Sequence, residues 1–202
     1  MSERATIAGA ILAGGQSRRM GENKALLTLA GTTLIERAVD RLRPQVSALV
    51  VNVHDDKTVL GIPGLPVARD AAGDHQGPLA GILAALRWAE AAELMWIVTA
   101  AVDTPFFPKD LVERLVGAAG ARTMAVARSC GRLHPVFGLW NTALTSELDR
   151  QIASGLRSAS EWVKLHDAGI ADWPVGAYDP FFNINQPADV TKATRIVDEF
   201  AP

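Results

Sequence analysis

The segment TIAGAILAGGQSRRMGENK, residues 6–24, joins a continuous apolar run to a loop rich in glycine and basic side chains. Residues 6–12 are small or apolar without alternation, which indicates a strand buried on both faces. Gly14 and Gly15 follow, and glycine lets backbone N–H groups approach an anion with no Cβ atom in the way. Two arginines and Lys24 add positive charge to the same loop. The segment therefore predicts a buried strand that leads into a phosphate-binding loop.

Strand-like and helix-like segments alternate along the rest of the chain. Apolar runs predict strands at 48–53, 65–70, 94–103, 123–129 and 134–140, and helical periodicity predicts helices at 32–45, 77–93, 108–120 and 187–200. The first strands are continuously apolar, as crossover helices on both faces of a sheet require. We expect an α/β fold with a single-domain, doubly wound, mostly parallel sheet flanked by helices.

Composition excludes several classes of protein. The chain has 202 residues, of which 49% are hydrophobic, and a net charge of −2, so neither a nucleic-acid footprint nor a polybasic membrane patch is present. Cys130 is the single cysteine, which excludes an internal disulfide. The N-terminal residues lack the pattern of a signal peptide, and no segment is apolar enough to span a bilayer. We expect a cytoplasmic protein that binds neither nucleic acid nor membrane.

Polar side chains stand where the predicted parallel strands end. Asn52, Asp70 and Asp103 each close an apolar strand, and the basic loop closes another. Ligands of open α/β sheets bind outside the carboxyl ends of the strands, so these side chains are candidates for one site. Asn52 or Asp70 taken alone is more typical of turn capping, and it is the set along one edge that favours a site.

The basic loop does not match the two commonest phosphate-binding motifs. Gly21 is followed by ENK rather than by lysine and a hydroxyl residue, which excludes a Walker A loop, and the G-x-G-x-x-G dinucleotide pattern is absent. A solvated basic loop remains the alternative to a polyphosphate site.

Asp103 closes the most apolar strand, where an unpaired charge is costly. Mg2+ prefers carboxylate and phosphate oxygens and keeps several waters, so one aspartate suffices when a nucleotide supplies the remaining ligands. The alternatives for Asp103 are a helix N-cap or a salt bridge to a neighbouring lysine or arginine.

Several motifs together resemble one enzyme family. They are LAGGQSRRMGENKALL (12–27), RDAAGDHQGPLAGI (69–82), VTAAVDTPFF (98–107), HPVFGLW (134–140) and FFNINQP (181–187). In order and approximate spacing they resemble the molybdenum cofactor guanylyltransferases, the MobA family. The resemblance implies a fold like that of the nucleotide-diphospho-sugar transferases. It also implies transfer of GMP from Mg·GTP to the phosphate of molybdenum-molybdopterin, which yields the guanine dinucleotide cofactor and pyrophosphate.

The resemblance also assigns residues. It implies one nucleotidyltransferase domain over 1–202, with a nucleotide-binding half at about 1–105 and an acceptor-binding, pterin-binding half at about 106–202. The implied nucleotide contacts are Leu12, Ala13, Gly14, Gly15, Arg19, Lys24, Asn52 and Asp70, with Arg19, Lys24 and Asp103 in catalysis and Asp103 as the Mg2+ ligand. The implied acceptor contacts are His134, Asn183 and Asn185, and His134 is equally suited to fixing the start of its strand. Asn23 departs from the family, which usually has aspartate there.

Three functions remain open at this point. The first is the guanylyltransferase, and the LAGG sequence at 12–15, rather than the LAAG of the cytidylyltransferase relatives, favours guanine. The second is a related nucleotidyltransferase that uses CTP or a sugar phosphate. The third is a carrier that binds the finished cofactor without catalysis, which the presence of Lys24 and Asp103 disfavours. Under the first, the molybdopterin insertase and apo-molybdoenzyme maturation proteins are the expected protein partners.

Overall fold

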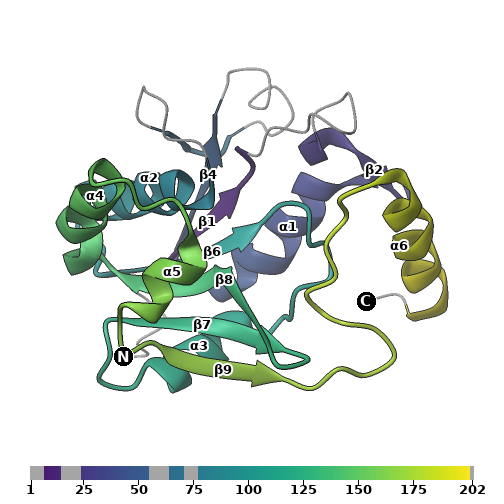
Figure 1. Ribbon diagram of the computed structural model, residues 1–202. Helices are drawn as coiled ribbons and strands as arrows, with labels where there is room; N and C mark the ends of the chain where they lie inside the picture. The colour runs from purple at the N-terminus through teal and green to yellow at the C-terminus, as the bar shows by residue number, and fades with distance from the viewer. Residues whose placement is uncertain (1–6, 15–23, 55–63, 71–76, 201–202) are drawn as a thin grey trace.

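The computed structural model describes residues 7–14, 24–54, 64–70 and 77–200 (Figure 1). Within these residues a seven-stranded sheet has the order β5, β4, β1, β6, β8, β7, β9, and β2 (Thr28–Leu29) pairs with β3 (Thr32–Thr33) in a separate ribbon. The strands of the large sheet are β1 (Ile7–Leu12), β4 (Ala48–Val53), β5 (Val67–Arg69), β6 (Trp96–Ala101), β7 (Met124–Ser129), β8 (Arg132–Asn141) and β9 (Gly169–Trp173).

The sheet is parallel except at β8. β8 runs antiparallel to β6 and to β7, whereas the pairs β1 with β4, β1 with β6, β4 with β5, and β7 with β9 are parallel. A two-residue turn at Cys130 and Gly131 joins β7 to β8, and both residues have positive φ, 48° and 70°. This turn matches the right-handed twist of a hairpin and reverses the chain. The predicted mostly parallel sheet is confirmed.

Helices pack on both faces of the sheet, as Figure 1 shows with α5 in front of it and α1 and α3 behind it. The helices are α1 (Leu34–Leu42), α2 (Pro78–Ala91), α3 (Leu111–Ala119), α4 (Thr145–Ala153), α5 (Ala159–Lys164) and α6 (Pro187–Phe200). α1, α3 and α6 contribute to one hydrophobic cluster, and α2, α4 and α5 contribute to the other.

β1 shows why the strands read as continuous apolar runs. Ile7 and Ile11 belong to the cluster with α1, whereas Ala8 and Ala10 belong to the cluster with α2, and all four are buried. Successive side chains of a strand point to opposite faces, so burial on both faces removes the polar positions. The doubly wound architecture follows from this pattern.

The predicted helix at 32–45 is shorter than its sequence pattern. Thr33 caps α1, because its side chain accepts a hydrogen bond from Glu36 N at 3.3 Å, and the Glu36 carboxylate accepts one from Thr33 N at 2.8 Å. The helix ends at Leu42, and residues Arg43–Gln45 form a 3-10 turn around Pro44. Proline lacks the N–H that a continuing α-helix needs.

Trp140 lies in the core. Its ring stacks on Trp162 with centroids 5.1 Å apart, and its Nε1 donates to Thr99 Oγ1 at 2.9 Å. Gly138 leaves the space that this ring occupies, because a Cβ atom there would lie 2.3 Å from Trp140 Cζ2. Trp140 is therefore a core residue and offers no stacking surface to a ligand.

Candidate functional site

A cavity of about 450 Å³ lies at the carboxyl ends of β1, β4, β5 and β6. The residues proposed from the sequence that line it are Leu12, Ala13, Gly14, Lys24, Asn52, Asp70, Asp103 and Asn183. Gly15 and Arg19 fall outside the residues that the structure describes. The cavity thus collects most of the described candidates at one edge of the sheet.

The register of the parallel strands brings these residues together. Leu12 pairs with Asn52 on one side and with Ala101 on the other, so the three strands end at the same level. The backbone continues this alignment, since Ala13 N donates to Asn52 O at 2.9 Å and Val102 N donates to Leu12 O at 3.1 Å. Residues distant in sequence therefore meet because parallel strands share a carboxyl edge.

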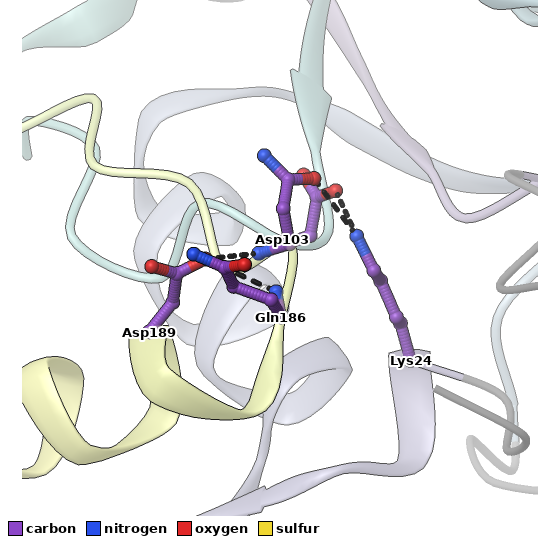
Figure 2. Close-up of polar contacts among 5 residues, drawn as sticks. Lys24, Asp103, Gln186 and Asp189 are labelled. Carbon is purple, nitrogen blue, oxygen red and sulfur yellow. Dashed lines mark hydrogen bonds and ion pairs between the residues drawn. The ribbon is translucent and has the colours of Figure 1, made fainter. Parts of the chain in front are cut away.

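Lys24 and Asp103 form an ion pair on the cavity wall. Lys24 begins the 3-10 helix η2 (Lys24–Leu26), and its Nζ lies 3.3 Å from Asp103 Oδ2 and donates to Asn185 Oδ1 at 3.1 Å (Figure 2). The two side chains keep 18% and 21% of their surface exposed, so both remain accessible from the cavity. Burial of the carboxyl group raises the pKa of Asp103, and the nearby Lys24 ammonium partly offsets this.

The FFNINQP segment is tied to the same aspartate. Ile184 N donates to Asp103 O at 2.8 Å, and the Asn183 side chain hydrogen-bonds to the Asp103 carboxylate. Asp189 Oδ2 accepts hydrogen bonds from Asn185 N at 2.9 Å and from Gln186 N at 3.0 Å (Figure 2). These bonds fix the backbone of the segment, so that Asn183 and Asn185 are both held beside Asp103.

The opposite wall of the cavity carries a second polar group. Asn52 is buried, and its Nδ2 donates to Asp70 Oδ1 at 2.8 Å and to Ala68 O at 3.2 Å. Asp70 Oδ2 lies 3.5 Å from His54 Nδ1. Asn52 and Asp70 are therefore a connected pair at the cavity and not independent turn caps.

His134 lies apart from this cavity. Its Nε2 is 2.8 Å from Ser129 Oγ, its ring stacks on Phe181 with centroids 4.6 Å apart, and Ser129 Oγ donates to Asp179 Oδ1 at 2.8 Å. Burial lowers the pKa of His134. Of the two roles that the sequence left open, this geometry favours fixing the strand, because it ties β8 to the segment that precedes α6.

Several cavity residues were not singled out from the sequence, among them His54, Gly81 and Val136. Val136 reaches the cavity because the register between β7 and β8 breaks, with Val126 opposite Gly138 but Ala127 opposite His134. Such irregularities redirect side chains, and the adjacent Pro135, which cannot donate to a strand ladder, was the available signal. No sequence pattern marked Gly81, because its place at the cavity depends on how α2 packs beside a neighbouring strand.

Comparison with known proteins identifies the family. Residues 9–169 match the family described as the MobA-like NTP transferase domain. The chain belongs to this family. A molybdenum cofactor guanylyltransferase from Cereibacter sphaeroides is 44% identical over 191 residues, which cover 94% of this chain and 96% of the relative. One from Nitrobacter hamburgensis is 40% identical over 194 residues, which cover 93% of each chain.

A solved structure agrees with this assignment. Molybdopterin-guanine dinucleotide biosynthesis protein A from Archaeoglobus fulgidus superposes with a TM-score of 0.75 at 26% identity, and the match covers 96% of this chain and 100% of that chain. The fold of this MobA-like chain is accordingly that of the nucleotidyltransferases related to nucleotide-diphospho-sugar transferases, as the sequence implied.

The residues near Asp103 suit a metal ion that is shared with a bound nucleotide. Across 7–14, 24–54, 64–70 and 77–200, no group of three or more His, Cys, Asp or Glu side chains could hold a metal. The partly buried carboxylate of Asp103 beside the amide side chains of Asn183 and Asn185 instead offers part of an oxygen shell, which matches the preference of Mg2+ for carboxylate, phosphate and water together.

None of the helices in the described part of the chain combines the length and apolar character that crossing a bilayer requires.

Proposed function

We propose that this chain transfers GMP from Mg·GTP to the phosphate of molybdenum-molybdopterin and releases pyrophosphate. The observation that carries the proposal is the position of Lys24 and Asp103, which line one cavity at the carboxyl edge of the parallel strands. The names of the relatives in the MobA-like family support the choice of reaction. A cation and a carboxylate in one cavity are what a triphosphate with a divalent ion requires.

The chemistry needs no activated side chain. An oxygen of the acceptor phosphate attacks the α-phosphorus of GTP, a new P–O bond forms, and the bond from the α-phosphorus to the oxygen that bridges to the β-phosphate breaks. Pyrophosphate leaves with that electron pair. The attacking oxygen is already ionised at neutral pH, so the protein contributes positioning and positive charge.

Lys24 is the described cation best placed for this task. Its ammonium is 3.3 Å from Asp103 and lines the cavity, so bound phosphates compete with Asp103 for it. Gly14 and Gly15 would let backbone N–H groups approach the phosphates, and Arg19 would add a second positive charge from the same loop.

Asp103, Asn183 and Asn185 would hold Mg2+ together with the phosphates. When bound, the ion supplies positive charge that stabilises the developing pyrophosphate. Asp103 must be ionised for this role, and the Lys24 ammonium favours that form. The hydrogen bond from Ile184 N to Asp103 O fixes the main chain at Asp103, and the Asn183 side chain bonds to the carboxylate.

On the remaining wall, Leu12 and Ala13 would contact the nucleotide, and Asn52 with Asp70 would hold the guanosine. The division into a nucleotide-binding half at about 1–105 and an acceptor-binding half at about 106–202 remains a proposal. So do contact of His134 with the pterin, docking to the molybdopterin insertase or to maturation proteins of apo-molybdoenzymes, and a cytoplasmic location.

Pyrophosphate release tests this function. The purified chain is incubated with Mg·GTP and molybdenum-molybdopterin, with Mg·CTP in parallel and with the acceptor omitted as control. We expect pyrophosphate from GTP only when the acceptor is present. A preference for CTP would assign the chain to the cytidylyltransferases. Binding of nucleotide without pyrophosphate from either would favour a carrier and contradict the proposal.

A further inference from the structure

The first turn of α2 passes directly beside the side chain of Asn52. A Cβ atom built on Gly81 would lie 2.6 Å from Asn52 Oδ1 and 3.4 Å from Leu12 Cδ2. The shorter distance is well inside van der Waals contact, so no other residue type fits at position 81 unless a neighbour moves. The buried position of Gly81 leaves the helix little room to shift away.

Asn52 has little freedom to move. It is 1% exposed, and its Nδ2 donates both to Ala68 O at 3.2 Å and to Asp70 Oδ1 at 2.8 Å. These two acceptors use both N–H groups of the amide. Reversing the amide would turn its oxygen toward two other oxygens, so the orientation is fixed.

The fixed orientation leaves the amide oxygen close to two glycines. A Cβ atom on Gly14 would lie 3.4 Å from Asn52 Oδ1, in addition to the close approach of Gly81. No residue in the described part of the chain donates a hydrogen bond to this oxygen, and Gly14, Gly81 and Asn52 all line the cavity. The amide oxygen is therefore able to accept a hydrogen bond from a ligand in the cavity.

We propose that Gly81 is a positioning residue for the nucleotide. By having no side chain it lets α2 pass Asn52, whose amide oxygen then accepts a hydrogen bond from an N–H or O–H group of the nucleoside. This inference deepens the proposed function and rests on GTP being the nucleotide. Gly81 touches no substrate and acts through Asn52.

The test compares two helix glycines. Alanine favours a helix over glycine at both positions, so a purely structural effect would stabilise both variants. Gly117 in α3 is exposed, and nothing lies within 4 Å of a Cβ atom built there, so Gly117→Ala is the matched control. Gly81→Ala alone forces the Asn52 amide to move.

We expect Gly81→Ala to weaken binding of Mg·GTP by about tenfold in calorimetry, the size of one lost hydrogen bond. The single-turnover rate at saturating GTP stays within about threefold of wild type, because the reacting phosphates are untouched. Gly117→Ala binds like wild type. In an Asn52→Ala background the oxygen is gone, so adding Gly81→Ala has no further effect on affinity.

GTP analogues identify the group that donates to Asn52. 2′-Deoxy-GTP, 3′-deoxy-GTP and ITP each lack one donor of guanosine and share its N1–H. If Gly81→Ala leaves the affinity for one analogue unchanged, the group that this analogue lacks is the donor to Asn52 Oδ1. If Gly81→Ala weakens binding of all three analogues, the donor is N1–H.

Equal GTP affinities for wild type and Gly81→Ala would overturn the inference. So would a tenfold loss of GTP affinity when Gly81→Ala is added to Asn52→Ala. If Gly81→Ala lowers the midpoint of thermal unfolding, the Asn52→Ala/Gly81→Ala double variant must unfold no lower than Asn52→Ala alone. A lower midpoint of the double variant would also overturn the inference. Absence of GTP binding already in wild type would contradict the proposed function itself.

Discussion

Lys24 is the residue on which the chemistry depends most. Its Nζ contacts Asp103 and Asn185 in the cavity, and two unit charges 4 Å apart interact by about 4 kcal/mol at an effective dielectric constant near 20. We predict that Lys24→Ala slows single-turnover transfer of GMP by about two to three powers of ten, equivalent to about 3–4 kcal/mol.

Rapid quenching with labelled GTP measures this rate. Lys24→Arg keeps the charge and is the control, with an intermediate rate expected because its planar head differs from an ammonium. A Lys24→Ala rate within threefold of wild type would contradict the role of Lys24.

Ionisation of the Asp103 carboxyl group lowers the free energy of unfolding of the protein. Burial raises the pKa of Asp103 above its ordinary value of 3.8, so the folded protein binds this proton more tightly than the unfolded chain does. Stability is therefore lost as the pH rises from about 3.8 through the folded-state pKa. Asp103→Asn removes the titrating group and should raise the free energy of unfolding at pH 7 while it abolishes Mg2+-dependent transfer.

Urea denaturation of Asp103→Asn and wild type at pH 4 and pH 7 measures the difference. The gain in stability of the variant should be larger at pH 7 than at pH 4. A variant less stable than wild type at pH 7 would show that the pair with Lys24 outweighs the burial of the carboxylate.

At the scale of elements, the start of α6 positions the asparagines of the site. Asp189 accepts the backbone N–H groups of Asn185 and Gln186, and these bonds lower its pKa. We predict that Asp189→Ala destabilises the protein by about 1 kcal/mol, as loss of a helix cap does, and also slows transfer because Asn185 is released. Asp189→Asn keeps an oxygen in the same place and should retain most of both properties.

Thermal unfolding and single-turnover transfer, measured on the same two variants, separate the effects. If Asp189→Ala lost stability but kept the wild-type rate, Asp189 would be a helix cap with no influence on the site.

The link between β8 and the segment before α6 should depend on pH. Because burial lowers the pKa of His134 in the folded protein, the unfolded chain takes up the proton first as the pH falls below about 6.5. The free energy of unfolding of wild type should therefore decrease between about pH 6.5 and the folded-state pKa. His134→Gln keeps a group that can bond to Ser129 Oγ but cannot titrate.

Urea denaturation from pH 5 to pH 8 compares the two proteins. The variant should lose less stability than wild type on acidification. Parallel curves for both would show that His134 does not cause the loss of stability on acidification.

At the scale of the whole molecule, the sequence predicted the sheet because burial on two faces leaves a visible pattern. Ile7, Ala8, Ala10 and Ile11 are all apolar for that reason, and the carboxyl edge could be located from the polar residues that follow such runs. Strand bounds were less accurate: β5 covers Val67–Arg69 and not 65–70. The extent of pairing depends on neighbours that the local sequence does not specify.

The contacts within the site could not be predicted in the same way. A salt bridge to a lysine or arginine was one of the alternatives for Asp103, but the sequence did not specify Lys24 as the partner. The anchoring of Asn52 by Asp70 and the passage of Gly81 beside Asn52 also join different elements. Such contacts depend on how helices pack on the sheet, and a single sequence carries no signal for a distance between two elements. The sequence therefore located the sheet edge that carries the site but not the contacts between the residues of the site.

The most direct test of the central claim is a crystal structure of the protein with GTP and Mn2+, whose anomalous signal locates the ion. We predict an ion beside Asp103, with the triphosphate in contact with Lys24 inside the cavity lined by both residues. A nucleotide bound at another surface, with Lys24 and Asp103 still paired to each other, would contradict the proposed role of both residues.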